Sequence, residues 1–352
     1  MFSQFIEIFS RWACLTIACG LLSLMALASP ASAQSAVTRD AAGLEALIKA
    51  AKAEGELTFY CAQVEIVARR VAEAFTAKYG IKAQYIRLAS AQLQQRYNAE
   101  AESGNFAADV IFNAGNAEGF AADGIKKGWV ESISTAGLPA LAPGSGFPTP
   151  LLRGATAVIQ VAPEYIVYNT DKVKGADIPK NWPDLLSPKF RGQIIVADPR
   201  ASDATLSQWI QVLNKYGEPY LRAFNLQIGR RHGGGVPAIQ SRAAGEGMLM
   251  IPITRPSIEA LQAKGAPVAG FIPEVVTGVE IQVMLTARAK SRHPNAGRLM
   301  ANYVLSPEGN AVFNADKGSF PVYDLSSLPK GYEAPPPVTA EIKEQITKLL
   351  GF

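Results

Sequence analysis

The first third of the chain alternates short β-rich segments with segments of helical periodicity. Strands are predicted over 56–61, 81–88 and 108–112, which are apolar or alternate apolar and polar residues. Helices are predicted over 66–79 and 91–103, and in the first of these the apolar residues gather on one face. This strand–helix–strand–helix–strand order implies a parallel sheet with helices on its faces. The expected fold class is therefore α/β.

A second stretch, residues 245–268, places a polar loop between a buried strand and a helix. The apolar run 248–253 has the length of a buried parallel strand, and helical spacing starts at Ser257. Open α/β sheets hold ligands in loops at the carboxyl ends of strands. Thr254 and Arg255 lie in this loop and are candidate ligand-binding residues. The guanidinium of Arg255 suits a carboxylate or phosphonate, and a surface salt bridge is its alternative role.

Length and charge limit the classes of function. A chain of 352 residues with 48% hydrophobic and 18% charged residues is expected to form two globular lobes. Its formal net charge is +4, but no dense stripe of lysine and arginine is present. We therefore expect no binding to nucleic acid. No nucleophile–base pair and no pair of acidic residues in a catalytic pattern is evident, so we expect no enzymatic activity and no cofactor.

Residues 1–33 have the features of a cleavable secretory signal. Arg11 precedes an apolar region over 12–28, and Ala31-Ser32-Ala33 forms a small-residue cleavage site before Gln34. A retained membrane helix is the alternative. No other segment is long and apolar enough to span a membrane, so the mature chain is expected outside the cytoplasm without a membrane span. Cys61 would then be its single cysteine, which excludes an internal disulfide.

Several segments together resemble the periplasmic solute-binding proteins of ABC importers. They are Gly55-Glu-Leu-Thr-Phe-Tyr60, residues 108–112, Tyr168-Asn-Thr170, the run from Trp182-Pro-Asp to Gly192, Gly245-Glu246 and Leu305-Ser-Pro-Glu-Gly309. The branch that they match includes iron(III), thiamine, polyamine and aminoethylphosphonate binders. The resemblance implies the type II periplasmic binding fold, which has two lobes, each with a mixed sheet flanked by helices, joined by two hinge strands near 162–170 and 278–286.

The resemblance also implies a domain organisation and partners. Lobe 1 is expected to comprise 34–162 and 278–352, with the C-terminal helices, and lobe 2 to comprise 163–277. The ligand would bind in the cleft between the lobes, which close on it by a hinge movement. The implied partners are a small-molecule solute and an inner-membrane ABC permease with its ATPase, and we expect a monomer.

Iron-binding members of this branch hold the metal with two adjacent tyrosines in the loop after the Gly-Glu motif. Counting from Gly245-Glu246, the matching positions here are Arg255 and Pro256. A guanidinium and a proline cannot replace phenolate oxygens as ligands of Fe(III). We therefore expect no metal site. A ferric-ion binder that uses Glu65, Tyr60 and Tyr168 is the alternative.

The same members hold an anion at a helix start with a Ser-Gly-Ala turn, and Ser202-Asp203-Ala204 is the matching sequence here. The first amide groups of a helix and its dipole favour a negative group. Asp203 replaces the glycine with a carboxylate. It either caps the helix or receives a cationic part of the ligand, and the sequence leaves both roles open.

The remaining candidate site residues follow from the fold. Gln63 lies in the loop after the first strand, and Asn113 and Asn116 lie in the loop after the third. Tyr168 is a candidate aromatic wall, although core packing is the more common role of such a residue. The expected function is capture of a small anionic organic solute, which is a carboxylate, a phosphonate or a phosphate ester. A secreted enzyme on the same fold is a further alternative.

Overall fold

The computed structural model describes residues 30–352, and the first lobe has the predicted βαβαβ order. Strand β1 pairs in parallel with β2 on one side and β3 on the other, because each crossover helix returns the chain to the end of the sheet where the previous strand began. The elements are β1 (Glu56–Cys61), α2 (Glu65–Tyr79), β2 (Lys82–Arg87), α3 (Ser90–Glu102), β3 (Val110–Ala114), α4 (Ala117–Lys126), β4 (Val130–Glu131) and β5 (Leu152–Arg153).

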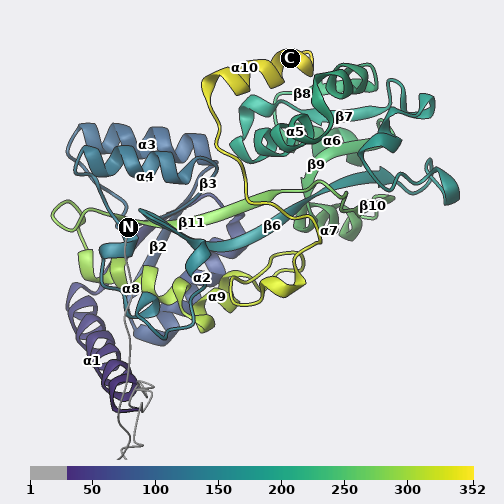
Figure 1. The fold of residues 1–352 in the computed structure, drawn as a ribbon. Helices are drawn as coiled ribbons and strands as arrows, with labels where there is room; N and C mark the ends of the chain where they lie inside the picture. Colours follow the sequence, from purple (N-terminus) through teal and green to yellow (C-terminus); the bar gives the residue numbers. More distant parts are fainter. Residues whose placement is uncertain (1–29) are drawn as a thin grey trace, which may run out of the picture.

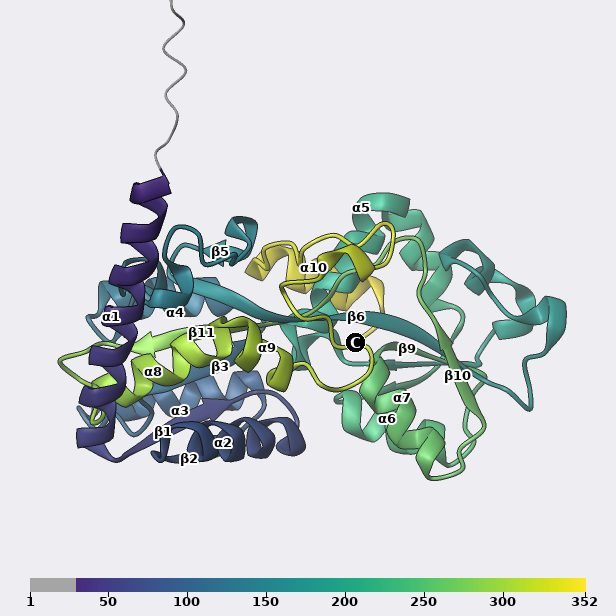
Figure 2. The ribbon, with the colours of Figure 1, turned by 90° about the horizontal axis from the view of Figure 1, so that it is seen from below.

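The long strand β6 (Thr156–Asn169) connects the two lobes (Figure 2). Its first half pairs with β11 (Gly278–Thr286), which lies beside β3. Its second half pairs with β9 (Leu249–Thr254) and β10 (Val268–Phe271) of the other lobe. The predicted fold class, a two-lobed mixed α/β structure, is confirmed. The two sheets are continuous through β6, in the strand order β2-β1-β3-β11-β6-β9-β7-β8.

The second lobe is built on the parallel strands β7, β8 and β9, of which β9 pairs with β6. Strand β7 lies between β8 and β9 and is parallel to both. Its elements are β7 (Ile194–Ala197), α5 (Asp203–Asn225), β8 (Ile228–His232), α6 (Gly235–Ala243) and α7 (Arg255–Ala263). Short 3₁₀ helices occupy many of the connections: η1 (Ile133–Thr135), η2 (Pro139–Leu141), η3 (Thr149–Leu151), η4 (Gly175–Asp177), η5 (Trp182–Leu186), η6 (Pro188–Phe190), η7 (Pro199–Ala201) and η8 (Leu325–Ser327).

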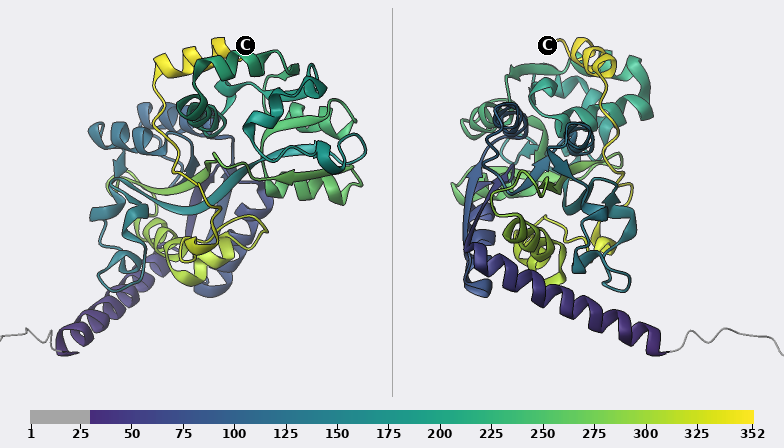
Figure 3. Two further views of the ribbon diagram at one scale, coloured as in Figure 1. Left: turned by 45° about the vertical axis from the view of Figure 1, so that its right-hand side comes forward. Right: turned by 90° about the vertical axis from the view of Figure 1, so that its left-hand side faces the viewer.

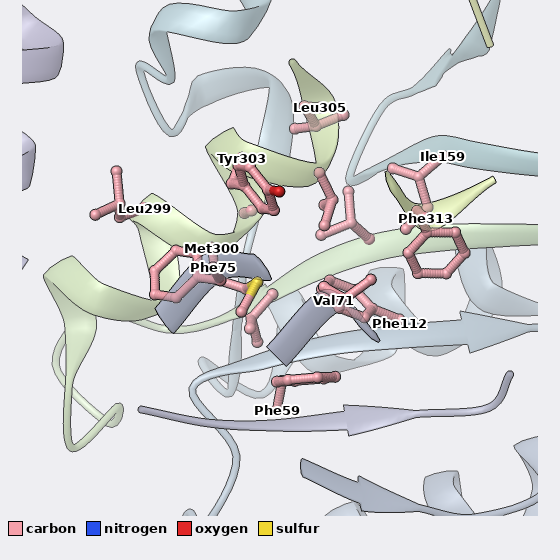
Figure 4. Close-up of a cluster of buried hydrophobic side chains, with 14 of the residues drawn as sticks. Phe59, Val71, Phe75, Phe112, Ile159, Leu299, Met300, Tyr303, Leu305 and Phe313 are labelled. Carbon is pink, nitrogen blue, oxygen red and sulfur yellow. The ribbon is translucent and has the colours of Figure 1, made fainter. Parts of the chain in front are cut away.

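Each lobe has its own aromatic core. In the first, shown in Figure 4, the Phe75 and Tyr303 rings are 5.8 Å apart, edge to face. In the second, the Trp182 and Trp209 rings are 5.6 Å apart and both side chains are buried. Buried aromatic rings add specific contacts to the area that they remove from water. Each lobe therefore has its own packed interior.

The C-terminal part of the chain crosses back from the first lobe to the second. After α8 (Pro294–Leu305) and α9 (Pro307–Phe313), the chain forms bridges at Val161–Phe320 and Val276–Tyr332. It then reaches α10 (Ala340–Leu349), which packs against α5 (the yellow segment in Figure 1). The C-terminal helices were expected in lobe 1, but α10 packs on the second lobe. The apolar face with Ile346 and Leu349 is buried in the second core.

The predicted signal peptide lies outside the described residues as far as residue 29, together with Cys14 and Cys19. Its cleavage site falls in the first turn of α1 (Pro30–Glu54). This helix packs on α8 and its N-terminal half projects from the body of the molecule (Figure 3). Within residues 30–352, no helix has both the length and the hydropathy needed to cross a membrane.

Candidate ligand-binding site

A cavity of about 770 Å³ lies between the lobes. One side is formed by the loops after β1, β2 and β3, and the other by the starts of α5 and α7. The hinge strands contribute Ala162 and Val279 to the wall. The polar residues that line it are Gln63, Arg87, Ser90, Gln94, Arg200, Ser202, Asp203, Thr254, Ser257, Glu259, Asp316, Lys317, Ser319 and Lys343.

The N-terminal residues of α2, α3, α5 and α7 all line this cavity. The residues that precede α2, α3 and α7 are Val64, Ala89 and Thr254, and none of them makes a side-chain cap hydrogen bond. Only α5 has a capping bond, in which Ser202 Oγ accepts from the Thr205 amide at 3.5 Å. The first amide groups of a helix have no intrahelical partner, and the dipole adds positive potential there. These helix ends together favour a negative ligand group in the cavity.

Basic side chains at the cavity strengthen this potential. In the described part of the chain, no carboxylate forms an ion pair with Arg87, Lys317 or Lys343; Arg87 Nε donates to the Gln63 carbonyl at 3.1 Å. Arg200 is different, because it pairs with Asp198 at 2.6 Å. Burial alone would raise the pKa of Asp198, but the hydrogen bonds from Arg200 outweigh burial and lower it.

Two of the acidic side chains at the cavity are already neutralised. Glu259 accepts from Arg255 Nε at 3.1 Å, and Asp316 pairs with Arg70 at 2.7 Å. Asp203 has no such ion pair among the described residues. The cavity therefore has an excess of unpaired positive charge.

Five of the predicted site residues meet in this cavity: Gln63, Ser202, Asp203, Ala204 and Thr254. Gln63 also hydrogen-bonds to Gln160 of β6, which ties the first loop to the hinge strand. Asp203 lies at the contact between the lobes, opposite Gly115.

Arg255 is placed differently from the expectation. It is the first residue of α7, and its side chain lies outside the lining of the cavity, 47% exposed and paired with Glu259. The hydrogen bond to Glu259 raises the pKa of Arg255. Gly318 packs closely against its aliphatic part, since a β-carbon on Gly318 would lie 2.5 Å from Arg255 Cβ. This placement matches the salt-bridge alternative.

The other predicted residues lie away from this cavity. Asn113 is fully buried in β3, and its Oδ1 has no hydrogen-bond partner in the described part of the chain. Asn116 precedes α4 with a positive φ of 28° and lines a second, smaller cavity. Tyr168 packs against the second core. Tyr60 is also buried, and its hydroxyl donates to Glu100 at 2.6 Å.

Several lining residues were missed by the sequence reasoning. Ser90 and Gln94 follow β2, and the same loop rule that selects Gln63 would have found Ser90. Lys317 and Lys343 belong to the C-terminal segment, far in sequence from the other lining residues. No local pattern marks them, because their position depends on the path of the chain after α9.

The family described as bacterial extracellular solute-binding proteins matches residues 107–345. An uncharacterized protein of Haemophilus influenzae is 25% identical over 280 residues, which cover 77% of this chain and 79% of that protein.

Two solved structures share the fold. The periplasmic binding protein AfuA from Actinobacillus pleuropneumoniae, solved with fructose-6-phosphate bound, has a TM-score of 0.60 at 20% identity. The alignment covers 84% of this chain and 97% of AfuA. Iron-bound HitA from Pseudomonas aeruginosa has a TM-score of 0.62 at 20% identity, with the same coverage of both chains. These TM-scores establish the fold, but at such low identity the ligand stays open, since the two proteins hold different ligands.

Proposed function

The chain belongs to the family of bacterial extracellular solute-binding proteins, and we propose that it captures a small organic anion between its lobes. It delivers this anion to an ABC import permease. The family is one of solute receptors, which argues against the enzyme alternative. An extracellular family acts outside the cytoplasm, and export through a cleavable signal remains a prediction.

The observation that carries this proposal is the convergence of helix N-termini on the cavity. The starts of α2, α3 and α7, which have no side-chain cap hydrogen bond, line a cavity that is also lined by Arg87, Lys317 and Lys343. Preorganised amide groups and unpaired cations stabilise a carboxylate, phosphonate or phosphate without the cost of rearrangement. A cationic solute such as a polyamine would be repelled by this positive potential.

The size of the cavity favours an organic solute. A volume of about 770 Å³ lies within the range of pockets that hold small organic molecules. An inorganic anion alone would leave most of this space unfilled. The lining also includes Val64, Ile66 and Pro256, which provide apolar contacts for the rest of the solute.

A ferric-ion receptor is the second candidate, because iron-bound HitA shares the fold. The composition of the cavity argues against it, since no tyrosine or histidine is among the described residues that line it. In the same part of the chain, no group of three or more His, Cys, Asp or Glu residues could hold a metal ion. The carboxylates that line the cavity, those of Asp203, Glu259 and Asp316, therefore do not form a group that could hold Fe(III) with its preferred hard oxygen ligands.

The arrangement also supports a division into lobes and a closing movement. Residues 34–162 and 278–339 form one lobe in this proposal, and 163–277 with α10 form the other. A solute that contacts α2 and α3 on one side and α5 and α7 on the other stabilises the closed arrangement. Bending would take place where β6 and the start of β11 cross between the lobes.

A thermal-shift screen tests the proposal directly. Organic carboxylates, phosphonates and phosphate esters are each added to the purified protein, with Fe(III) and spermidine as separate arms. A ligand that binds only the folded state raises the melting temperature. We expect stabilisation by at least one organic anion and none by spermidine. Stabilisation by Fe(III), with a visible charge-transfer band, would replace the organic-anion proposal with the ferric one.

A further inference from the structure

A second cavity of about 450 Å³ lies beside the first. It is bounded by the start of α4, by β11, by α5 of the other lobe and by the proline-rich segment 335–338. The contact between Gly115 and Asp203 lies where the two cavities approach each other. The charged side chains that line the second cavity are Glu118, Arg153 and Glu280.

Arg153 is the unusual member of this group. Its side chain is 28% exposed, but its Nε is buried and has no hydrogen-bond partner in the described part of the chain. The nearest carboxylate oxygens belong to Glu280, at 3.6 Å from Nη2, and to Glu118, at 3.9 Å from Nε. These distances allow electrostatic attraction but exceed those of direct hydrogen bonds. A guanidinium normally uses its planar set of donors on a carboxylate or phosphate, and the buried Nε of Arg153 has room to donate to an added anionic group.

The carboxylates at this cavity outnumber the single cation. Glu280 is only 5% exposed, and it accepts from the Tyr332 hydroxyl at 3.1 Å. Burial raises the pKa of Glu280 even with Arg153 nearby, so its charge is incompletely compensated. Glu118 is more exposed and accepts a long hydrogen bond of 3.5 Å from Gln282. The pair of carboxylates would be stabilised by an added positive group.

The start of α4 provides further donors for an anion. Asn116 precedes this helix and makes no side-chain cap hydrogen bond, so the first-turn amides lack that partner. Ala117, Glu118 and Gly119 all line the cavity. One side of the cavity thus offers donors from Arg153 and α4, and acidic oxygens lie next to them.

We propose that this second cavity binds a free amino acid or a similar small zwitterion. Its carboxylate would occupy the donors of Arg153 and the first turn of α4. Its ammonium group would lie between Glu118 and Glu280. The site shares Gly115 and Ala204 with the anion cleft described above, but none of its charged residues lines that cleft. Because α5 also lines the cavity through Ala204 and Ser207, the bound zwitterion would stabilise the contact between the lobes.

The test is a thermal-shift screen of the purified protein with each standard amino acid, followed by calorimetry. At a concentration about 100 times its Kd, the bound amino acid is expected to raise the Tm by roughly 5 °C. Arg153→Gln should reduce the affinity about tenfold or more, because it removes the charge-assisted bonds. Arg69→Gln, at an exposed arginine of α2, is the matched control and should leave the affinity unchanged.

Glu118→Gln keeps the test decisive if Arg153→Gln folds poorly. Glu118 is 56% exposed, so its substitution is expected to leave the ligand-free Tm unchanged while weakening binding of the ammonium group several-fold. Lys317→Gln in the larger cavity should not alter amino-acid binding. The proposal is overturned if no amino acid stabilises the wild-type protein. It is also overturned if the stabilisation persists undiminished in both Arg153→Gln and Glu118→Gln.

Discussion

Gly115 of the first lobe and Asp203 of the second meet across the cleft, so closely that a β-carbon on Gly115 would lie 2.9 Å from Asp203 Cβ. Gly115 has a φ of +56°, and Asp203 is the first residue of α5. The contact fixes how near the start of α5 comes to the loop after β3. The width of the cleft is therefore set at a point where no larger residue fits.

Gly115→Ala should hold the lobes apart and weaken solute binding by about tenfold or more, because the closed contact would be lost. Affinity for the best anion from the thermal-shift screen is the measurement. The matched control is Gly128→Ala, since Gly128 has a φ of +70° but open space where a β-carbon would lie. Both variants carry a backbone cost of about 1 kcal/mol. Equal affinities of the two variants would show that the contact with Asp203 is unimportant for binding.

Lys317→Gln and Lys343→Gln should each lower the affinity for an anion about three- to tenfold. Each removes a cation that has no ion pair within the described residues, and the loss should shrink at high salt. Titration calorimetry at low and high ionic strength measures both effects. Lys82→Gln, at an exposed lysine of β2 away from the cavity, serves as the control. A salt-independent affinity in the wild-type protein would contradict the electrostatic argument.

Arg255→Ala distinguishes the sequence-based prediction from the structure. A ligand contact in the loop after β9 predicts a loss of about 1.5–3 kcal/mol in binding free energy. The structure pairs Arg255 with Glu259 outside the cavity, so we expect a loss below about 0.5 kcal/mol. Calorimetry with the same anion decides between the two. A tenfold loss of affinity would restore Arg255 as a binding residue.

Glu164, at the crossing point of β6, should make stability depend on pH. Its side chain is buried, Oε2 has no hydrogen-bond partner in the described part of the chain, and desolvation raises its pKa to about 8. Because the folded pKa lies above the unfolded value, the full contribution to stability is present below about pH 4.5. This contribution to stability decreases as the pH rises above about 4.5, and it is lost once the pH has passed the folded pKa of about 8.

Denaturant unfolding at pH 5 and pH 9 measures this effect. Glu164→Gln should remove a pH-dependent loss on the order of a few kcal/mol in the free energy of unfolding. Glu73→Gln, at an exposed position of α2, should retain the wild-type dependence. Identical pH profiles for the wild-type protein and Glu164→Gln would exclude a role for this carboxyl group.

The strands and crossover helices of the first lobe could be predicted because their periodicity is local. The loops at the carboxyl ends of these strands followed from the parallel arrangement, which is why Gln63, Ser202 and Thr254 were found. The pairing of Arg255 with Glu259 was also accessible, since residues four apart share a helix face. These features depend on short stretches of sequence.

The α/β class, the strand–loop–helix order and the family could all be predicted from the sequence. Which side chains share a cavity depends on the tertiary structure. Lys317 and Lys343 reach the cleft because the chain crosses back to α5 after α9, and Arg153 meets Glu280 only through the pairing of distant strands. Asp203 lies opposite Gly115 because the two lobes pack against each other at this point. Such contacts join segments far apart in the chain, and the physical reason is that packing of the two cores, rather than local periodicity, brings them together.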